Sequence, residues 1–136
     1  MSPDCTFDEE KHEYRINDRL VPSVTQIIST VLPGWQASEW YLQRGRAMHH
    51  GCRLLDEGTL DWATVSPEIE QRVRAWKYFL LLIVPDALIA CEVPLFSDKY
   101  QFAGTLDRLF SVGAAMTLID LKSTIQPQVR VQLGGY

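Results

Sequence analysis

The sequence predicts a mixed α/β (α+β) domain, in which an N-terminal hairpin and helices precede a three-strand antiparallel meander and a final helix. Two observations predict this class. Helix-capping signals open segments of helical period in the first part of the chain. From Ala87 onward, short apolar segments instead alternate with turn residues, which is typical of strands. The length, 136 residues, fits a single domain that spans 1–136.

The first elements are short. Residues 7–21 predict a hairpin that turns at the Asn-Asp pair 17–18. Ser23 and Gln26 have the spacing of a capping box, in which each side chain bonds the other residue's backbone N–H. They predict a helix that ends near residue 32, because Pro33-Gly34 follows.

A longer helix is expected from the N-cap Ser38 to about Glu57, where a glycine ends it. Its apolar stripe consists of Tyr41, Met48, Cys52 and Leu55. His49 lies at the flank of this stripe, and Gly45 lies one turn before it on the same side. His50 is expected on the solvent side.

A third helix should begin at Ser66-Pro67, because proline is favoured at the first helical position. Its core stripe is formed by Ile69, Val73, Trp76, Leu80 and Ile83. The last turns, 79–84, are apolar on every side, so we expect them to be buried on several sides.

The second half of the chain predicts the meander. The expected strands are Leu88–Leu95, Gln101–Phe110 and Met116–Lys122, with turns between them. A helix is expected from about Pro127 to Tyr136.

The composition excludes several classes of protein. The net charge of −4 argues against holding nucleic acid by bulk positive charge, but not against a nuclease whose clustered carboxylates bind cations. The longest apolar run, Tyr78–Val84, is far shorter than the roughly 20 residues of a membrane span, and the N-terminus does not resemble a signal peptide. Three scattered cysteines, Cys5, Cys52 and Cys91, favour a reducing cytoplasm over a disulfide framework or thiolate zinc site.

The third expected strand carries a candidate site. Asp120 and Lys122 share one face of it among apolar neighbours, where burial of their charges needs compensation. A metal ion with a bound phosphate would supply it. Asp120 and the backbone carbonyl of Leu121 would bind the metal, and Lys122 would hold attacking water or stabilise charge on the phosphoryl group. The alternative is an ordinary ion pair on a strand face.

Four further residues extend this candidate site. Asp107, flanked on its strand face by small residues, could lie across from Asp120 in an antiparallel pair. His49 could bind the same cation, although a histidine at this position is commonly a boundary residue of the core. Gln132 and Tyr136 face one way on the last helix and are uncharged donors suited to a nucleic-acid backbone, or else ordinary surface residues.

The order of these motifs is more specific than any one of them. It reads Gly45-x-x-x-His49, Gly104-x-x-Asp107, Ile119-Asp120-Leu121-Lys122 and Gln132-x-x-x-Tyr136. This order resembles the PD-(D/E)XK nuclease superfamily, in its RecB-like branch with the phage-type exonucleases. The resemblance implies a restriction-endonuclease-like core and cleavage of DNA phosphodiester bonds with Mg²⁺ or Mn²⁺.

The resemblance also implies roles for individual residues. The catalytic group would be Asp107, Asp120 and Lys122, and the metal ligands His49, Asp107, Asp120 and the Leu121 carbonyl. Gln132 and Tyr136 would contact DNA or orient the active-site lysine. The implied setting is DNA recombination, repair or phage DNA processing in a bacterial or phage-infected cytoplasm. The implied partners are DNA and a recombination, helicase or single-strand-binding protein.

The chain departs from this family in three ways. The family has a further strand after the last helix, so this chain resembles a C-terminally truncated product with uncovered apolar surface. The cysteines do not match the four that hold an iron–sulfur cluster in some members, and no such cluster is expected. Arg53 stands where some members have an acid, and Glu92, which resembles the acid of the first strand, is not assigned as a ligand.

Two alternatives to a nuclease are therefore open. The first is a catalytically inactive DNA-binding or partner-docking module on the same fold. The second is an ordinary α+β interaction domain in which the motif order is accidental. The motifs do not distinguish single-stranded from double-stranded DNA.

Overall fold

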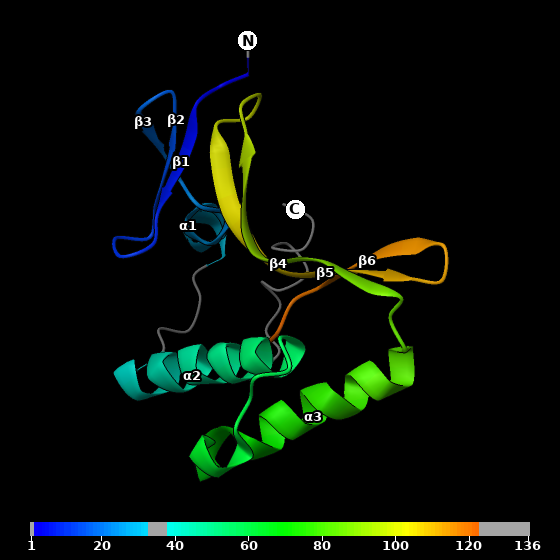
Figure 1. The fold of residues 1–136 in the computed structure, drawn as a ribbon. Coiled ribbons are helices and arrows are strands. Elements are labelled where there is room, and N and C mark those ends of the chain that lie inside the picture. Colours follow the sequence, from blue (N-terminus) through cyan, green and yellow to red (C-terminus); the bar gives the residue numbers. More distant parts are fainter. Residues whose placement is uncertain (1, 33–37, 123–136) are drawn as a thin grey trace.

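The computed structural model describes residues 2–32 and 38–122 (Figure 1). In these residues it is a mixed α+β fold with three α-helices and two antiparallel three-stranded sheets, which confirms the predicted class at that level. The elements are β1 (Cys5–Asp8), β2 (Glu13–Ile16), β3 (Arg19–Val21), α1 (Val24–Val31), α2 (Glu39–Asp56), a 3₁₀ turn (Trp62–Thr64), α3 (Pro67–Ile83), β4 (Ala87–Ser97), β5 (Phe102–Val112) and β6 (Ala115–Ile119).

The N-terminal sheet contains the predicted hairpin and one additional strand. β2 and β3 pair across the turn at Asn17 and Asp18, both of which have positive φ as the tight hairpin turns require. The pattern did not predict β1, which pairs with β2 in antiparallel fashion. Its residues Cys5 and Phe7 pack against the cluster around Tyr14, and this contact holds β1 in place.

The capping box at the start of α1 is confirmed. The Gln26 N–H donates to Ser23 Oγ (3.1 Å), and the Ser23 N–H donates to Gln26 Oε1 (2.8 Å). Just before the cap, the Ala103 N–H donates to the Pro22 carbonyl (3.0 Å), which joins this region to β5. The predicted stop at Pro33-Gly34 lies outside the described residues.

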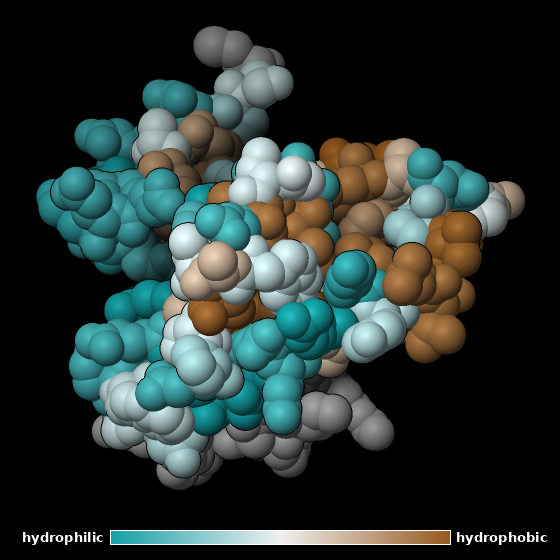
Figure 2. Space-filling model, turned by 60° about the horizontal axis from the view of Figure 1, so that its bottom comes forward, coloured by the Kyte–Doolittle hydropathy of each residue, from teal (hydrophilic) through white to brown (hydrophobic). Residues whose placement is uncertain are grey.

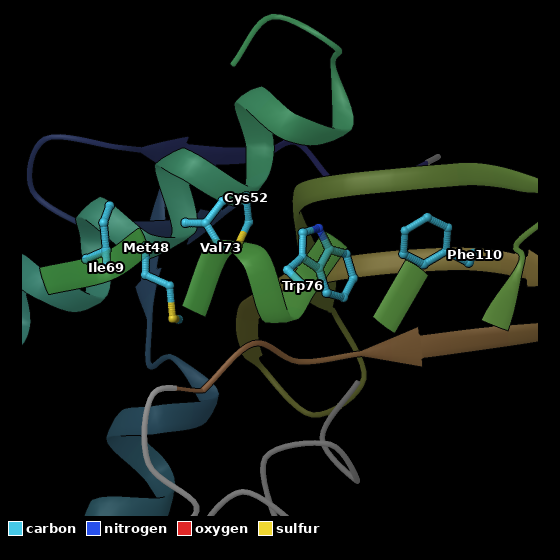
Figure 3. Close-up of a cluster of buried hydrophobic side chains, with 6 residues drawn as sticks. All are labelled: Met48, Cys52, Ile69, Val73, Trp76 and Phe110. Atoms are coloured by element: carbon cyan, nitrogen blue, oxygen red, sulfur yellow. The ribbon is translucent and has the colours of Figure 1, made fainter. Parts of the chain in front are cut away.

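The main core lies between α2, α3 and the β4–β6 sheet (Figure 3). Its buried members are Met48, Cys52, Ile69, Val73, Trp76 and Phe110. The two helices approach closely at Gly51, where a Cβ would lie 3.0 Å from Val73 Cγ2. The predicted stripes of both helices are confirmed in their central turns. Tyr41 is the exception: it lies near the start of α2, beyond this core, and is 39% exposed.

The prediction that the last turns of α3 are buried on several sides is wrong. Leu82 is 82% exposed and Leu81 is 64% exposed, and Val84, which ends the helix with positive φ, is 70% exposed. In Figure 1 this end of α3 extends past the end of α2, so α2 does not cover it. Figure 2 shows hydrophobic surface gathered at one end of the molecule.

The predicted meander is confirmed, with the strand order β4-β5-β6. The long β4–β5 hairpin spans two packing regions: Phe96 and Ala103 meet the N-terminal sheet, and Phe110 belongs to the helical core. Where this hairpin meets the N-terminal sheet, the Tyr14 hydroxyl and Thr105 Oγ1 are hydrogen-bonded at 2.7 Å. β6 ends at Ile119, three residues earlier than predicted, and the helix expected from Pro127 lies outside the described residues.

None of the helices in 2–32 and 38–122 combines the length and apolar character needed to cross a bilayer.

Candidate active site

The structure brings the two predicted carboxylates together. β5 and β6 pair with Arg108 opposite Ile119, and one further step in this register places Asp107 opposite Asp120. The chain has already left β6 at this point. The Leu121 N–H donates to Asp107 Oδ2 (2.8 Å), which fixes the segment after β6 against β5. The two acids therefore meet as predicted, although a side-chain-to-backbone bond replaces the last step of the ladder.

Lys122 joins this group. Its Nζ lies 3.1 Å from Asp120 Oδ2, and the Asp120 side chain is only 4% exposed. The prediction that strand alternation puts these two side chains on one face is wrong in its reason, because β6 ends at Ile119. Their contact depends instead on the conformation of the segment that Asp107 anchors.

His49 reaches the same group from the middle of α2. Its Nδ1 lies 3.7 Å from Asp107 Oδ1, which is within ion-pair range but beyond a hydrogen bond. The imidazole is 28% exposed, whereas the Asp107 side chain is 14% exposed. His50 is on the exposed side of the helix, as predicted. His49 therefore lies at the solvent boundary of the site, next to one carboxylate.

The surroundings of Asp107 disfavour its ionised form. The pKa of this carboxyl is raised from 3.8 to about 6, chiefly by burial and also by the charge of Asp120 and a hydrogen bond between the two carboxyl groups. His49 and the Leu121 N–H act in the opposite direction and lower it. Two adjacent carboxyl groups resist simultaneous ionisation. A bound cation would remove that conflict.

The donor set fits a hard divalent ion with few protein ligands. Asp120 Oδ2 is buried and has no hydrogen-bond partner among the described residues, because its contact with Lys122 Nζ lacks hydrogen-bond geometry. This oxygen therefore has lone pairs that a metal ion could use beside the Lys122 ammonium group. Within 2–32 and 38–122, no group of three or more His, Cys, Asp or Glu side chains is arranged to hold a metal. Mg²⁺ commonly binds one or two carboxylates and keeps several waters, so two acids and a carbonyl suffice for it.

A cleft of about 300 Å³ opens beside this group. Its walls come from α2, α3, the last residue of β6 and the segment after it: Met48, Cys52, Arg72, Ala75, Trp76, Phe79, Ile119, Asp120, Leu121 and Lys122. Asp120 and Lys122 thus belong both to the carboxylate group and to the cleft wall. A molecule in the cleft would lie directly against them.

A buried ion pair behind the site was not predicted. Arg108 is fully buried, and its Nε lies 2.6 Å from Asp56 Oδ2. The Trp76 indole N–H donates to the other oxygen of Asp56 (2.8 Å), and Arg108 Nη1 donates to the carbonyl of Asp107 (2.8 Å). Arg108 therefore fixes the backbone that carries Asp107. The available signal was an arginine at a core position of a strand, between Leu106 and Phe110.

Glu92, the acid in β4 that the sequence left unassigned, belongs to the ion-pair network around Arg108. Glu92 Oε2 accepts a hydrogen bond from Arg53 Nη1 (3.2 Å), and its Oε1 lies 4.0 Å from Arg108 Nη1. Arg53 is the residue that departs from the family pattern. In this chain these two residues are paired with each other, and the carboxylate of Glu92 is committed to guanidinium groups.

The remaining sequence candidates have no described role in the site. Gln132 and Tyr136 lie outside the described residues. All three cysteines are free thiols, and burial raises the pKa of Cys52 to about 12, so this thiol stays protonated as a packing group. Comparison of the chain with protein-family models, with curated proteins and with solved structures gives no match.

Proposed function

We propose that this protein is a Mg²⁺- or Mn²⁺-dependent DNA nuclease with a restriction-endonuclease-like core, and that it acts as an exonuclease in DNA recombination, repair or phage DNA processing. One observation carries the proposal. Asp107 and Asp120 meet beside Lys122, and a buried oxygen of Asp120 has no hydrogen-bond partner among the described residues. The order of the sequence motifs supports the same reaction class.

In the proposed mechanism, Asp107 and Asp120 would hold the cation, with the Leu121 carbonyl as a third ligand. The bound ion would polarise the scissile phosphate and favour ionisation of the attacking water. Lys122 lies 3.1 Å from Asp120 and is 32% exposed, so its ammonium group can reach a phosphate in the cleft. There it stabilises the negative charge that develops during in-line attack.

Supporting residues set the geometry of this group. The Leu121 N–H holds one oxygen of Asp107, which leaves the other oxygen toward His49. His49 can complete the ligand set through its imidazole, a ligand that Mn²⁺ accepts more readily than Mg²⁺. Arg108 fixes the main chain at Asp107 from the core side. We therefore expect cleavage to depend directly on Asp107, Asp120 and Lys122. Arg108 should affect cleavage only through the folding of the site.

A cleavage assay tests the proposal. Linear DNA labelled at the 5′ or the 3′ end, and a closed circle, are incubated with Mg²⁺, with Mn²⁺ or with EDTA. Asp120→Asn and Lys122→Met should each lower the rate by about 10²-fold or more. The matched control is Lys11→Met, because Glu9-Glu10-Lys11 has the same acid-x-lysine spacing in an exposed turn. Parental rates in both site variants would refute the assignment.

A catalytically inactive DNA-binding or partner-docking module is the second candidate. It is favoured by the lack of a group of three His, Cys, Asp or Glu metal ligands in the described part of the chain. Calorimetry with Mn²⁺ separates the two functions. Binding at sub-millimolar concentration that is lost in Asp120→Asn supports the nuclease, whereas no binding at millimolar Mn²⁺ supports the module.

A further inference from the structure

The cleft beside Asp120 has a charged rim and an apolar wall. Its charged side chains are one acid, Asp120, and two bases, Lys122 and Arg72. Most of the remaining lining is apolar or aromatic. Its volume of about 300 Å³ lies at the lower end of the range for small-ligand sites. A site of this size and composition suits one flat, partly apolar group that carries a negative charge at its edge.

The Arg72 guanidinium at this rim has N–H groups that are available to a ligand. Its Nη1 donates to the Glu68 carbonyl (3.1 Å), and within the described residues no carboxylate lies within ion-pair distance of it. The other arginine of the same helix differs: Arg74 pairs with Glu70 at 2.8 Å and stacks over Trp62 at 4.5 Å. A guanidinium with unused N–H groups is a strong ligand for a phosphate.

The wall of the cleft presents an aromatic face. Trp76 and Phe79 are stacked, with ring centroids 5.7 Å apart and planes 21° from parallel. Trp76 is 5% exposed and its indole N–H is bound by Asp56, whereas Phe79 is 39% exposed. Phe79 is thus the accessible member of the stack. Nucleobases stack on exposed aromatic rings of this kind irrespective of sequence.

From these features we propose that the cleft is a binding site for one unpaired nucleotide next to the scissile phosphate, with the base on Phe79 and its phosphate on Arg72 and Lys122. The inference rests on the proposed nuclease function and specifies its substrate: a single strand, or a duplex end whose last nucleotide is unpaired. A base inside a duplex is stacked on both faces and must leave the helix before it can enter such a cleft.

A fluorescent oligonucleotide tests the cleft without cleavage. The probe is a five-nucleotide DNA strand with a terminal 2-aminopurine, titrated with the 136-residue chain in Ca²⁺. We expect quenching on binding, and a loss of affinity of about tenfold in Phe79→Ala, within the range for one stacked base. Arg72→Ala should weaken binding by a similar factor, and Arg72→Lys should restore part of it. Arg74→Ala is the matched control and should bind as the parent does.

Each outcome is decisive for the cleft. Parental affinity in both Phe79→Ala and Arg72→Ala, with unchanged urea midpoints, overturns the inference. An equal loss in Arg74→Ala also overturns it, because the effect would then be general charge. If Phe79→Ala fails to fold, it is replaced by Phe79→Leu, which keeps an apolar side chain of more similar size and removes the aromatic face.

The cleavage assay separates this inference from the proposed function. If the chain binds the probe through Arg72 and Phe79 but cleaves no DNA, the nuclease proposal fails and the nucleotide site stands as part of a binding module. If it cleaves blunt duplex and single strands equally, and Arg72→Ala changes neither rate, the nucleotide site fails while the nuclease stands.

Discussion

Replacement of Asp107 by asparagine should stabilise the metal-free protein at alkaline pH. The pKa of this carboxyl rises from 3.8 to about 6 in the folded chain, chiefly because the group is buried. Its contribution to stability is therefore fully present below about pH 4 and is lost as pH rises through 6. Since one pKa unit corresponds to about 1.4 kcal/mol, the ionised carboxylate costs the folded state about 3 kcal/mol at pH 8.

Asp107→Asn removes this charge and keeps an oxygen that can accept the Leu121 N–H. In EDTA at pH 8 we expect the variant to have a free energy of unfolding higher than the parent by up to about 3 kcal/mol. The difference should shrink steadily between pH 6 and pH 4. Urea unfolding followed by tryptophan fluorescence at pH 4, 5, 6, 7 and 8 measures it.

Added Mn²⁺ should reverse the order of stability. A cation that binds only the folded parent stabilises it by mass action, and the variant lacks one of the carboxylates that would bind the ion. The reasoning is refuted if Asp107→Asn is less stable than the parent at pH 8 in EDTA, or if the difference does not change between pH 4 and pH 8.

Three further predictions concern the scaffold. Asp56→Asn removes the negative charge that is paired with a fully buried guanidinium and should lower the free energy of unfolding by about 3 kcal/mol or more, as measured in urea. Ser23→Ala removes the capping box of α1 and should cost about 1 kcal/mol; an unchanged midpoint would contradict the assigned cap. Leu82→Glu, at the exposed end of α3, should stay within about 0.5 kcal/mol of the parent, and a large loss would mean that this turn is buried.

The local signals in the sequence were sufficient for most elements. Ser23 with Gln26 and Ser66 with Pro67 fix helix starts through the backbone N–H groups that they satisfy or remove, so these starts are readable from neighbouring residues. The meeting of Asp107 and Asp120 was also within reach, because an antiparallel meander with a short turn leaves few registers to choose from.

Features that depend on distant contacts were not predictable in this way. The apolar residues at the end of α3 predict burial but are exposed, because periodicity shows which residues are apolar and not how far a neighbouring element extends. β1 is held by packing on Tyr14 and not by a strong pattern of its own. The Arg108–Asp56 pair joins residues separated by 52 positions, and no local spacing encodes it.

The adjacency of Asp107 and Arg108 has a consequence for how this chain can misfold. The two side chains have opposite charges and different surroundings: one meets His49 and Leu121, the other Asp56. If β5 slipped by one residue in one direction, the Arg108 guanidinium would occupy the position of Asp107 and leave Asp56 without its partner. A slip in the other direction would bury the Asp107 carboxylate against Asp56 with no cation beside it. Errors in strand pairing are therefore penalised at the same place where chemistry is proposed, and a wrongly assembled sheet would be both unstable and inert.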